Sequence, residues 1–453
     1  MATRIPHSAT RPEPRAPGLV AAALVAAVAI GFALPGALRD APPLAASLAP
    51  AALLVCIALV ALAYLRPSVV VIAAFALSAI VRVEPAPTDL LLVIVAGVSL
   101  LSGRLSIRLP PSVAIALPML LVVDILSAVN AGSTGRAISY VSISIYLALT
   151  AVWLTGAFAD ATIARRALKA YVIAATVAAL VTVMVLELHL PGYSSLVYGD
   201  SRAQGLFKDP NVFGPYLVPA AAIVLEEIGR PRLLGWRPRR LFLVFAILGA
   251  GVIFAYSRAG WLNFAIAAAT VIVITSGRRG GLRAATRAGA AALGCTLVGF
   301  ALLAATGSLT FFSERSKLEA YDAGRFANQA TGLANASVHV LGYGPGQAEK
   351  TLALSTHSTY VRAAYEQGYL GLAALTALLA ATLGVAIRSA LRDRDLHGLG
   401  SAAMLGALLG GLVNSAFVDT THWRHLWMVF ALIWAMAAIP ARAASPDDGE
   451  CPT

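Results

Sequence analysis

The sequence predicts an all-α protein, a polytopic bundle of transmembrane helices with one long external loop that itself contains a helix. Of the 453 residues, 59% are hydrophobic and only 12% are charged, whereas soluble domains carry about a quarter charged residues. Several apolar stretches reach the roughly 20 residues that a helix needs to cross a bilayer. A single soluble core could not bury this much apolar surface, so we expect an integral membrane protein.

Fourteen apolar windows define the expected helices. They span residues 19–38, 44–65, 68–83, 88–103, 111–130, 137–159, 168–190, 211–228, 240–256, 259–277, 288–306, 361–387, 398–417 and 424–440. The windows 68–83 and 88–103 are short, and one of them fits a re-entrant segment, so we predict twelve to fourteen spans. The window 19–38 is long for a signal-peptide core and lacks a convincing cleavage site, so we expect it to be the first transmembrane helix.

The placement of charge predicts the orientation of these spans. With the N-terminus inside, 22 of the 34 lysines and arginines fall in cytoplasmic segments, in agreement with the positive-inside rule. GRPRLLGWRPRR, from Gly229, and GRRGGLRAATR, from Gly277, are two such basic loops. We therefore expect a multi-pass membrane protein with both termini in the cytoplasm.

The other 12 lysines and arginines would lie outside, against this bias. Most of them gather in segments 191–210, 256–258 and 307–357. The last segment has about fifty residues, a length at which loops are usually functional or disordered. Its sequence RSKLEAYDAGRFANQATGLANA, from Arg315, has helix-forming chemistry, so we expect an ordered helix there.

These features predict three regions. They are N-terminal transmembrane helices (1–190), a core with the external loop (191–375), and C-terminal transmembrane helices with a cytoplasmic tail (376–453).

Charge and cysteine content argue against other classes of protein. A net charge of +12 would suggest nucleic-acid binding in a soluble protein, but no basic run is interleaved with aromatic residues, so we expect no nucleic-acid partner. Cys56 and Cys295 lie in apolar windows and Cys451 lies in the tail. We therefore expect no disulfide and no structural zinc.

Three short motifs place arginines next to helix ends. Arg258 lies between two apolar windows with almost no loop to hold it in water, and a guanidinium there needs a partner or an anionic ligand. Its fork of N–H donors matches phosphate oxygens. Arg202 and Lys208 are either interfacial anchors or anion contacts. Arg325 lies on the expected external helix, where a solvated surface arginine is the alternative reading.

The stretch HSTYVRAAYEQGYLG, from His357, begins the window 361–387. A neutral imidazole can accept a proton from a hydroxyl group. Arg362 and Glu366 are four residues apart and can pair along one helix face. Tyr360 fits an interfacial aromatic residue.

Two further motifs concern the backbone. In KDPNVFG, Asp209 is the expected N-cap of a helix that begins at Pro210. GYGPGQAE, from Gly342, could cradle a phosphate with its N–H groups, but it lacks the Lys-Ser/Thr ending of a P-loop. A tight turn is the favoured interpretation.

Taken together, GLFKDPNVFG, YSRAGW, the external GRF helix, GYGPG, and HSTY followed by E-x-G-Y-L-G resemble the superfamily of O-antigen ligases and O-antigen polymerases. The likeness covers roughly residues 195–375. It implies a glycosyltransferase of GT-C-like helical architecture that works without a metal or cofactor. Such enzymes take a glycan from undecaprenyl diphosphate and pass it to lipid A-core or to another lipid-linked glycan, outside the inner membrane.

The resemblance also implies roles for residues. Arg202, Arg258 and Arg325 would bind the diphosphate, and His357 would activate or orient the acceptor hydroxyl. We expect His357 and Arg258 to be catalytic and assign substrate binding to the remaining external candidates, namely Arg202, Arg325, Lys208, Tyr360 and Arg362. Membrane lipids are the other expected partners.

Two alternative functions stay open. A transporter or flippase of a lipid-linked or anionic substrate would also have many spans and external cations, but it would line its midplane with polar residues, and Asp124 is the most embedded acid. A structural subunit of a polysaccharide assembly complex would need no single arginine or histidine. The sequence does not separate ligase from polymerase.

Overall fold

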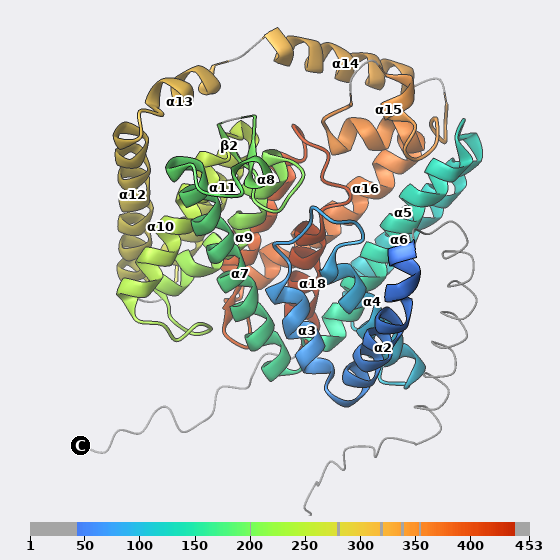
Figure 1. Ribbon diagram of the computed structural model, residues 1–453, viewed down its shortest axis with the longest axis horizontal. Helices are drawn as coiled ribbons and strands as arrows, with labels where there is room; N and C mark the ends of the chain where they lie inside the picture. The colour runs from blue at the N-terminus through green and yellow to red at the C-terminus, as the bar shows by residue number, and fades with distance from the viewer. Residues whose placement is uncertain are drawn as a thin grey trace, which may run out of the picture. The chain divides into compact units, whose positions relative to one another are not determined.

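The computed structural model describes residues 43–199, 201–278, 281–317, 320–336, 339–352 and 355–439, and Figure 1 shows that they are almost entirely helical. The regular helices begin and end as follows: α2 Pro43–Leu65, α3 Pro67–Ala76, α4 Pro87–Leu101, α5 Pro111–Ser127, η1 Ala128–Asn130, α6 Thr134–Ala157, α7 Ala161–Leu188, α8 Tyr193–Leu196, α9 Pro210–Gly229, α10 Pro238–Phe254, α11 Arg258–Ser276, α12 Gly281–Ala305, α13 Leu309–Ser316, α14 Ala320–Ala336, α15 Ala348–Thr351, α16 Thr359–Leu391, α17 Ser401–Asn414 and α18 Arg424–Ala438.

The only strands among the described residues form two antiparallel pairs of two residues each. Val197–Tyr198 (β1) pairs with Arg202–Ala203 (β2), and Asp395–Leu396 (β3) pairs with Leu399–Gly400 (β4). The predicted all-α class is therefore confirmed.

Every predicted window from 44–65 onward contains a helix, and the window 19–38 lies outside the described residues. Seven described helices are long and apolar enough to cross a membrane, or eight if a bent pair at Leu54–Leu65 and Pro67–Ala76 is one span. The predicted count of twelve to fourteen was larger because it included windows that form only short helices. Pro87–Leu101, Ser401–Asn414 and Arg424–Ala438 have 14 or 15 residues, which is about 22 Å of helix.

The chain forms two compact units, residues 1–71 with 90–105, and residues 72–89 with 106–453. In the described part of the first unit, Arg104 donates a hydrogen bond to the carbonyl of Tyr64 (2.8 Å) and lies over its ring. The second unit contains all the predicted site residues. The boundaries predicted at 190 and 375 stay predictions.

Helix α9 is at the centre of the second unit, since nearly all of its residues are buried. Helices α7, α10, α11, α12 and α17 pack around it. The pair α11–α17 is in especially close contact, because a Cβ on Gly406 would lie 2.6 Å from the carbonyl oxygen of Ala267. Small residues allow membrane helices to approach in this way.

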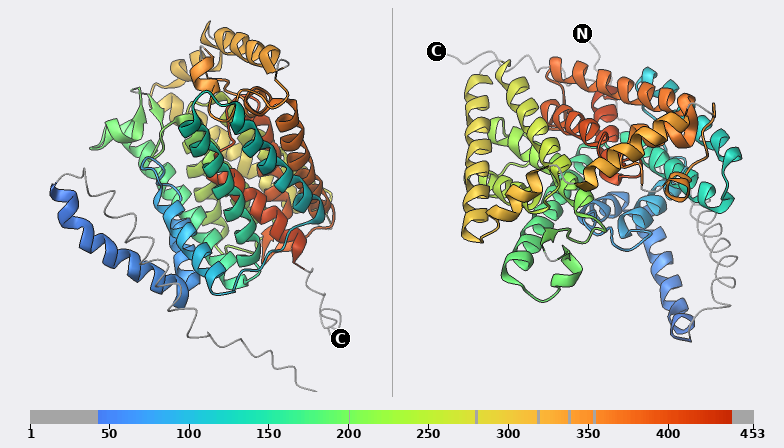
Figure 2. Two further views of the ribbon diagram at one scale, coloured as in Figure 1. Left: turned by 90° about the vertical axis from the view of Figure 1, so that its right-hand side faces the viewer. Right: turned by 90° about the horizontal axis from the view of Figure 1, so that it is seen from above.

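The segment between α12 and α16 positions the candidate site. Its helix α14 coincides with the external helix predicted from the sequence. Figures 1 and 2 show α14 lying across the ends of the long helices of the second unit rather than beside them. Residues of α14 therefore cover the ends of α11 and α16.

Candidate functional site

A cavity of about 600 Å³ opens at this end of the second unit. Its walls come from the β1–β2 pair, the first turns of α9 and α11, helices α13 and α14, and the segments before α16 and after α17. The lining residues are Tyr198, Arg202, Asp209, Asn211, Arg258, Ala259, Leu262, Arg315, Asp322, Arg325, Phe326, Gln329, His357, Phe417 and Val418. The structure thus brings together Arg202, Arg258, Arg325 and His357, which the sequence analysis had chosen from separate motifs.

Arg202 is positioned by two neighbours. It follows the turn of the β1–β2 pair, opposite Tyr198. Its Nη2 donates to Oδ1 of Asn211 (3.0 Å), and its Nε donates to the carbonyl of Ala255 (3.2 Å). Asn211 lies in the first turn of α9, where Asp209 caps the helix by accepting from the N–H of Asn211 (2.8 Å). The predicted N-cap is therefore confirmed.

Arg258 is the first residue of α11. The turn before it is tight, with Tyr256 at a φ of 47° and Ser257 capping α11 through the N–H of Gly260. The Arg258 guanidinium forms an ion pair with Asp322 of α14 (2.6 Å) and donates to the carbonyl of Lys317 (2.6 Å). The partner that the sequence analysis required for this arginine is thus Asp322, which ties α14 to α11.

Arg325 lies one turn after Asp322 on the same face of α14. Its Nη2 donates to the carbonyl of Phe417 (2.5 Å) in the segment that follows α17. The alternative reading of a solvated surface arginine does not describe Arg325, because its side chain lines the cavity.

His357 immediately precedes the N-cap of α16. Its φ of 47° is rare for a residue other than glycine. Ser358 caps α16, and the side chain of Gln329 donates to the carbonyl of His357 (3.3 Å). Burial and the positive charge of Arg325 lower the pKa of the His357 imidazole below its ordinary value of 6.5, and Asp209 and Asp419 offset part of this effect. The imidazole is therefore neutral at pH 7 and can accept a proton.

The charge of the cavity suits an anionic group. Four arginines line it, namely Arg202, Arg258, Arg315 and Arg325, against the two carboxylates of Asp209 and Asp322. With a neutral His357 the lining has an excess of two positive charges. Guanidinium groups match the oxygens of phosphates in both charge and geometry.

Three other predicted substrate-binding residues lie outside this cavity. Lys208 forms an ion pair with Glu84 (2.8 Å), and both side chains are more than half exposed. The hydroxyl of Tyr360 donates to the carbonyl of Leu412 (2.8 Å) in α17. Arg362 belongs to a separate buried network. Local sequence placed all three near the right helix ends, but it could not tell which way their side chains point.

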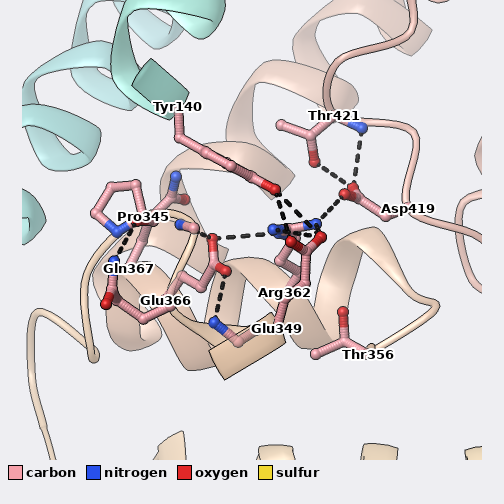
Figure 3. A network of polar contacts seen from close by, with 12 residues as sticks. Tyr140, Pro345, Glu349, Thr356, Arg362, Glu366, Gln367, Asp419 and Thr421 are labelled. Atoms are coloured by element: carbon pink, nitrogen blue, oxygen red, sulfur yellow. Dashed lines mark hydrogen bonds and ion pairs between the residues drawn. The ribbon is translucent and has the colours of Figure 1, made fainter. Parts of the chain in front are cut away.

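Figure 3 shows this network, in which Arg362 lies between three carboxylates. Its guanidinium contacts Asp419 (2.5 Å), Glu366 (3.2 Å) and Glu349 (3.5 Å). The predicted pairing of Arg362 with Glu366 is confirmed. Arg362 is 6% exposed and Glu366 is 3% exposed, so this pair is internal. Tyr140 completes the network by donating to Glu349 and lying under the Arg362 guanidinium.

The GYGPG turn docks on the same network. The carboxylate of Glu366 accepts from the N–H groups of Gly346 (2.8 Å) and Ala348 (3.0 Å). A phosphate cradle would need these same N–H donors, but here the carboxylate of Glu366 occupies them. The motif is therefore a structural turn, the interpretation that the sequence favoured.

The network also holds one wall of the cavity. Asp419 follows Phe417 and Val418, which line the cavity. Thr359 donates its N–H to the carbonyl of Ser415 (2.9 Å), and its hydroxyl accepts from the N–H of Thr420 (2.8 Å). The first turn of α16 is thereby fastened to the segment after α17, directly beside His357.

Sequence analysis did not select Asn211, Asp322 or Gln329. Asp322 had a usable signal, since it lies three residues before Arg325 on a predicted helix and so shares its face. Asn211 and Gln329 carried no signal of their own, because neutral amides are common in first turns and on polar helix faces.

Comparison with known proteins agrees with this geometry. Residues 243–376 match the family model described as O-Antigen ligase. The match begins in α10, ends in α16, and includes Arg258, Arg325 and His357, while Arg202 precedes it. No curated protein matches the chain in a sequence search. The family match supports the resemblance seen in the sequence: this segment is similar to the O-antigen ligase and polymerase superfamily, a group of membrane glycosyltransferases.

Proposed function

We propose that the chain transfers a glycan from undecaprenyl diphosphate to an acceptor hydroxyl outside the inner membrane, the acceptor being lipid A-core or another lipid-linked glycan. One observation carries this proposal: Arg202, Arg258, Arg325 and a neutral His357 line one open cavity. The family match supports the reaction class.

In this reaction, the acceptor oxygen attacks the anomeric carbon of the donor glycan and forms the new glycosidic bond. The bond between that carbon and the diphosphate oxygen breaks, and undecaprenyl diphosphate leaves with the bonding electrons. His357 takes the proton of the acceptor hydroxyl as general base. The arginines stabilise the charge that develops on the leaving diphosphate, so the proposed chemistry needs no metal.

The arrangement explains why the arginines and His357 are needed in one cavity. Asp322 and Asn211 hold Arg258 and Arg202 in position before substrate arrives. Preorganised donors of this kind lose little free energy in reorganising during the reaction. The bound diphosphate then neutralises the excess positive charge of the lining residues.

Transfer by purified variants tests the proposal, with a lipid-linked glycan as donor. We expect His357→Ala and Arg202→Gln each to lower the rate about a hundredfold or more, the usual cost of losing one such group. Lys350→Gln is the matched control, because Lys350 is exposed on α15 and does not line the cavity. Folded His357→Ala and Arg202→Gln proteins with full activity would exclude the proposed roles.

A deletion strain separates the two acceptors. Surface glycans that carry a single repeat in place of a ladder would identify a polymerase. Long chains left on undecaprenyl diphosphate, and missing from their final acceptor, would identify a ligase.

Transport of a lipid-linked substrate predicts a different result. It would move labelled donor across sealed vesicles without forming a new glycosidic bond. The lining arginines and His357 flank helix termini, since Arg258 begins α11 and His357 precedes α16. This position at the helix ends supports transfer at a membrane face rather than passage through the bundle.

A further inference from the structure

A second cavity, of about 820 Å³, opens where α16 and α9 end, whereas the first cavity lies where these helices begin. The 20 residues of α9 alone separate the two by about 30 Å of helix. The lining of the second cavity combines α7, the α9–α10 loop, the β3–β4 turn and the last turn of α18. The lining residues are Ala161, Arg165, Arg232, Arg392, Asp393, Arg394, Asp395, Leu396, His397, Gly398, Met436 and Ile439.

Two of the lining arginines are held by backbone carbonyls. Arg165 donates to the carbonyls of His397 (2.7 Å) and Arg232 (3.0 Å). Arg394 donates to the carbonyl of Ala437 (2.9 Å). A guanidinium has five N–H donors and a full positive charge. Carbonyl partners therefore fix the positions of these arginines but do not neutralise them, and they leave further donors for a ligand.

Arg392 is different from the other lining arginines. It is exposed at the end of α16, and its guanidinium makes no hydrogen bond or ion pair with any residue that the structure describes. Its charge is therefore available to a group that enters the cavity.

The carboxylates nearby do not balance the arginines. Asp393 pairs with Arg230 (2.7 Å) and Arg278 (2.9 Å), which do not line the cavity, and it lies 3.7 Å from the lining residue Arg232. Asp395 lies 3.7 Å from Arg232 and also caps the N–H of Gly398. The whole cluster has six arginines, the four of the lining with Arg230 and Arg278, against the four carboxylates of Glu226, Glu227, Asp393 and Asp395. An excess of two positive charges results.

The β3–β4 turn, which carries four of the twelve lining residues, has a defined backbone conformation. His397 and Gly398 have φ values of 53° and 100°, the pattern of a two-residue hairpin turn with both central residues left-handed. The ring of His397 is hydrogen-bonded to the carbonyl of Phe158 (3.1 Å). A preformed cationic site therefore exists, and it does not depend on a flexible surface loop.

We infer that this second cavity binds a phosphate group. Four arginines from distant parts of the chain converge on one space with an excess of two positive charges, which suits a phosphate with one or two negative charges. One wall is apolar, formed by Leu396, Met436 and Ile439, so the group can belong to a lipid headgroup as well as to a free phosphate. The positive-inside rule explains exposed arginines at a membrane face. It does not explain why four arginines converge on one cavity.

Ligand-dependent thermal unfolding of the purified full chain tests the inference. The probes are inorganic phosphate, short-chain phosphatidylglycerol, and short-chain phosphatidylcholine as a zwitterionic control. We expect the unfolding midpoint to rise with phosphate or phosphatidylglycerol, because a ligand that binds the folded state stabilises it. A response to both probes identifies a free phosphate site, and a response to phosphatidylglycerol alone identifies a headgroup site.

Two matched charge reversals distinguish binding in this cavity from a general attraction by surface charge. Arg392→Glu should weaken the apparent affinity about tenfold or more, the effect of losing one charged hydrogen bond. Arg239→Glu makes the same charge change at an exposed position outside the cavity, and it should change the affinity less than about twofold. Arg392→Gln, which removes the positive charge without adding a negative one, serves if Arg392→Glu lowers the midpoint without ligand. An equal loss in the Arg392 and Arg239 variants, or no response of the unaltered chain to either probe, would overturn the inference.

Discussion

At the scale of single residues, His357 combines an unusual backbone conformation with a specific charge environment. Its positive φ belongs to a region that costs of the order of 1–3 kcal/mol for most residues and often marks functional sites. The cap by Ser358 and the hydrogen bond from Gln329 keep this conformation in place. The same geometry brings the imidazole near Arg325, which disfavours its protonated form.

This environment predicts the pH dependence of transfer. Burial first and Arg325 second lower the pKa of His357 below 6.5, so the imidazole stays neutral to a lower pH than a free histidine. The acidic limb of kcat/KM should therefore have its midpoint below pH 6.5. Arg325→Gln removes the cation and should move that midpoint to higher pH, whatever its effect on the rate. A pH–rate profile of both proteins checks this, and an unmoved midpoint would contradict the assignment of His357 as base.

Arg362 predicts a large effect on stability. Arg362→Met would leave Glu366 and Asp419 buried without their cation, and removing one member of a buried ion pair costs about 3–5 kcal/mol. Adding Asp419→Asn should recover at least about 1 kcal/mol, because neighbours in one network are not additive. Denaturant unfolding of the single and double variants measures this. Additive losses would show that Arg362 and Asp419 are not coupled.

At the scale of elements, α16 is broken where the GYGPG turn meets it. Gly368 has a φ of 70° and a ψ of −174° inside the helix. The carbonyls of Tyr365 and Glu366, near this break, accept from the N–H groups of Tyr343 (3.0 Å) and Gly344 (2.8 Å). The turn thus replaces helical hydrogen bonds with partners from a distant segment.

This contact predicts the outcome of a glycine substitution. A Cβ on Gly368 would collide with the carbonyl oxygen of Val340, and the positive φ adds strain for any other residue. Gly368→Ala should therefore destabilise the protein by about 1–3 kcal/mol. Gly384→Ala is the control on the same helix, since a Cβ there would meet nothing nearer than Nη1 of Arg388, 3.9 Å away, and it should be neutral or slightly stabilising. Equal stability of the two variants would refute a structural role for the break.

Element boundaries were largely predictable from the sequence. Apolar windows located thirteen described helices, and the composition of 315–336 located α14. The length of each helix was not predictable. Windows 398–417 and 424–440 are apolar on average, but they include loop residues at their ends. The break in α16 was not predicted, since Gly368 lies inside the window 361–387, which the sequence analysis treated as one span.

At the scale of the whole second unit, the arginines form two groups at opposite helix ends. Arg202, Arg258 and Arg325 lie around the first cavity, whereas Arg232 and Arg392 lie around the second. The sequence analysis had assigned the first group to the outside and the second to the cytoplasm. Their separation along α9 and α16 agrees with this division and makes it testable.

Cysteine labelling measures the sidedness. Phe326→Cys and Arg239→Cys place thiols at exposed positions near the two ends, in a background that lacks Cys56, Cys295 and Cys451. A membrane-impermeant maleimide should label the Phe326 variant in intact cells and the Arg239 variant only after permeabilisation. Labelling of both variants from one side would contradict a bundle that spans the membrane between them.

The sequence by itself determined the fold class and the positions of most helices and showed the resemblance to a superfamily, because hydropathy, turn residues and short motifs are local properties. It also pointed to four residues of the first cavity: Arg202 and Arg258 as cations beside apolar windows, where charge is costly, and Arg325 and His357 through the resemblance. Only the tertiary structure decided that Lys208, Tyr360 and Arg362 turn away from this cavity and that Asp322 turns toward it. The partner of a polar side chain is chosen by contacts between segments far apart in the chain, and no local pattern contains those contacts.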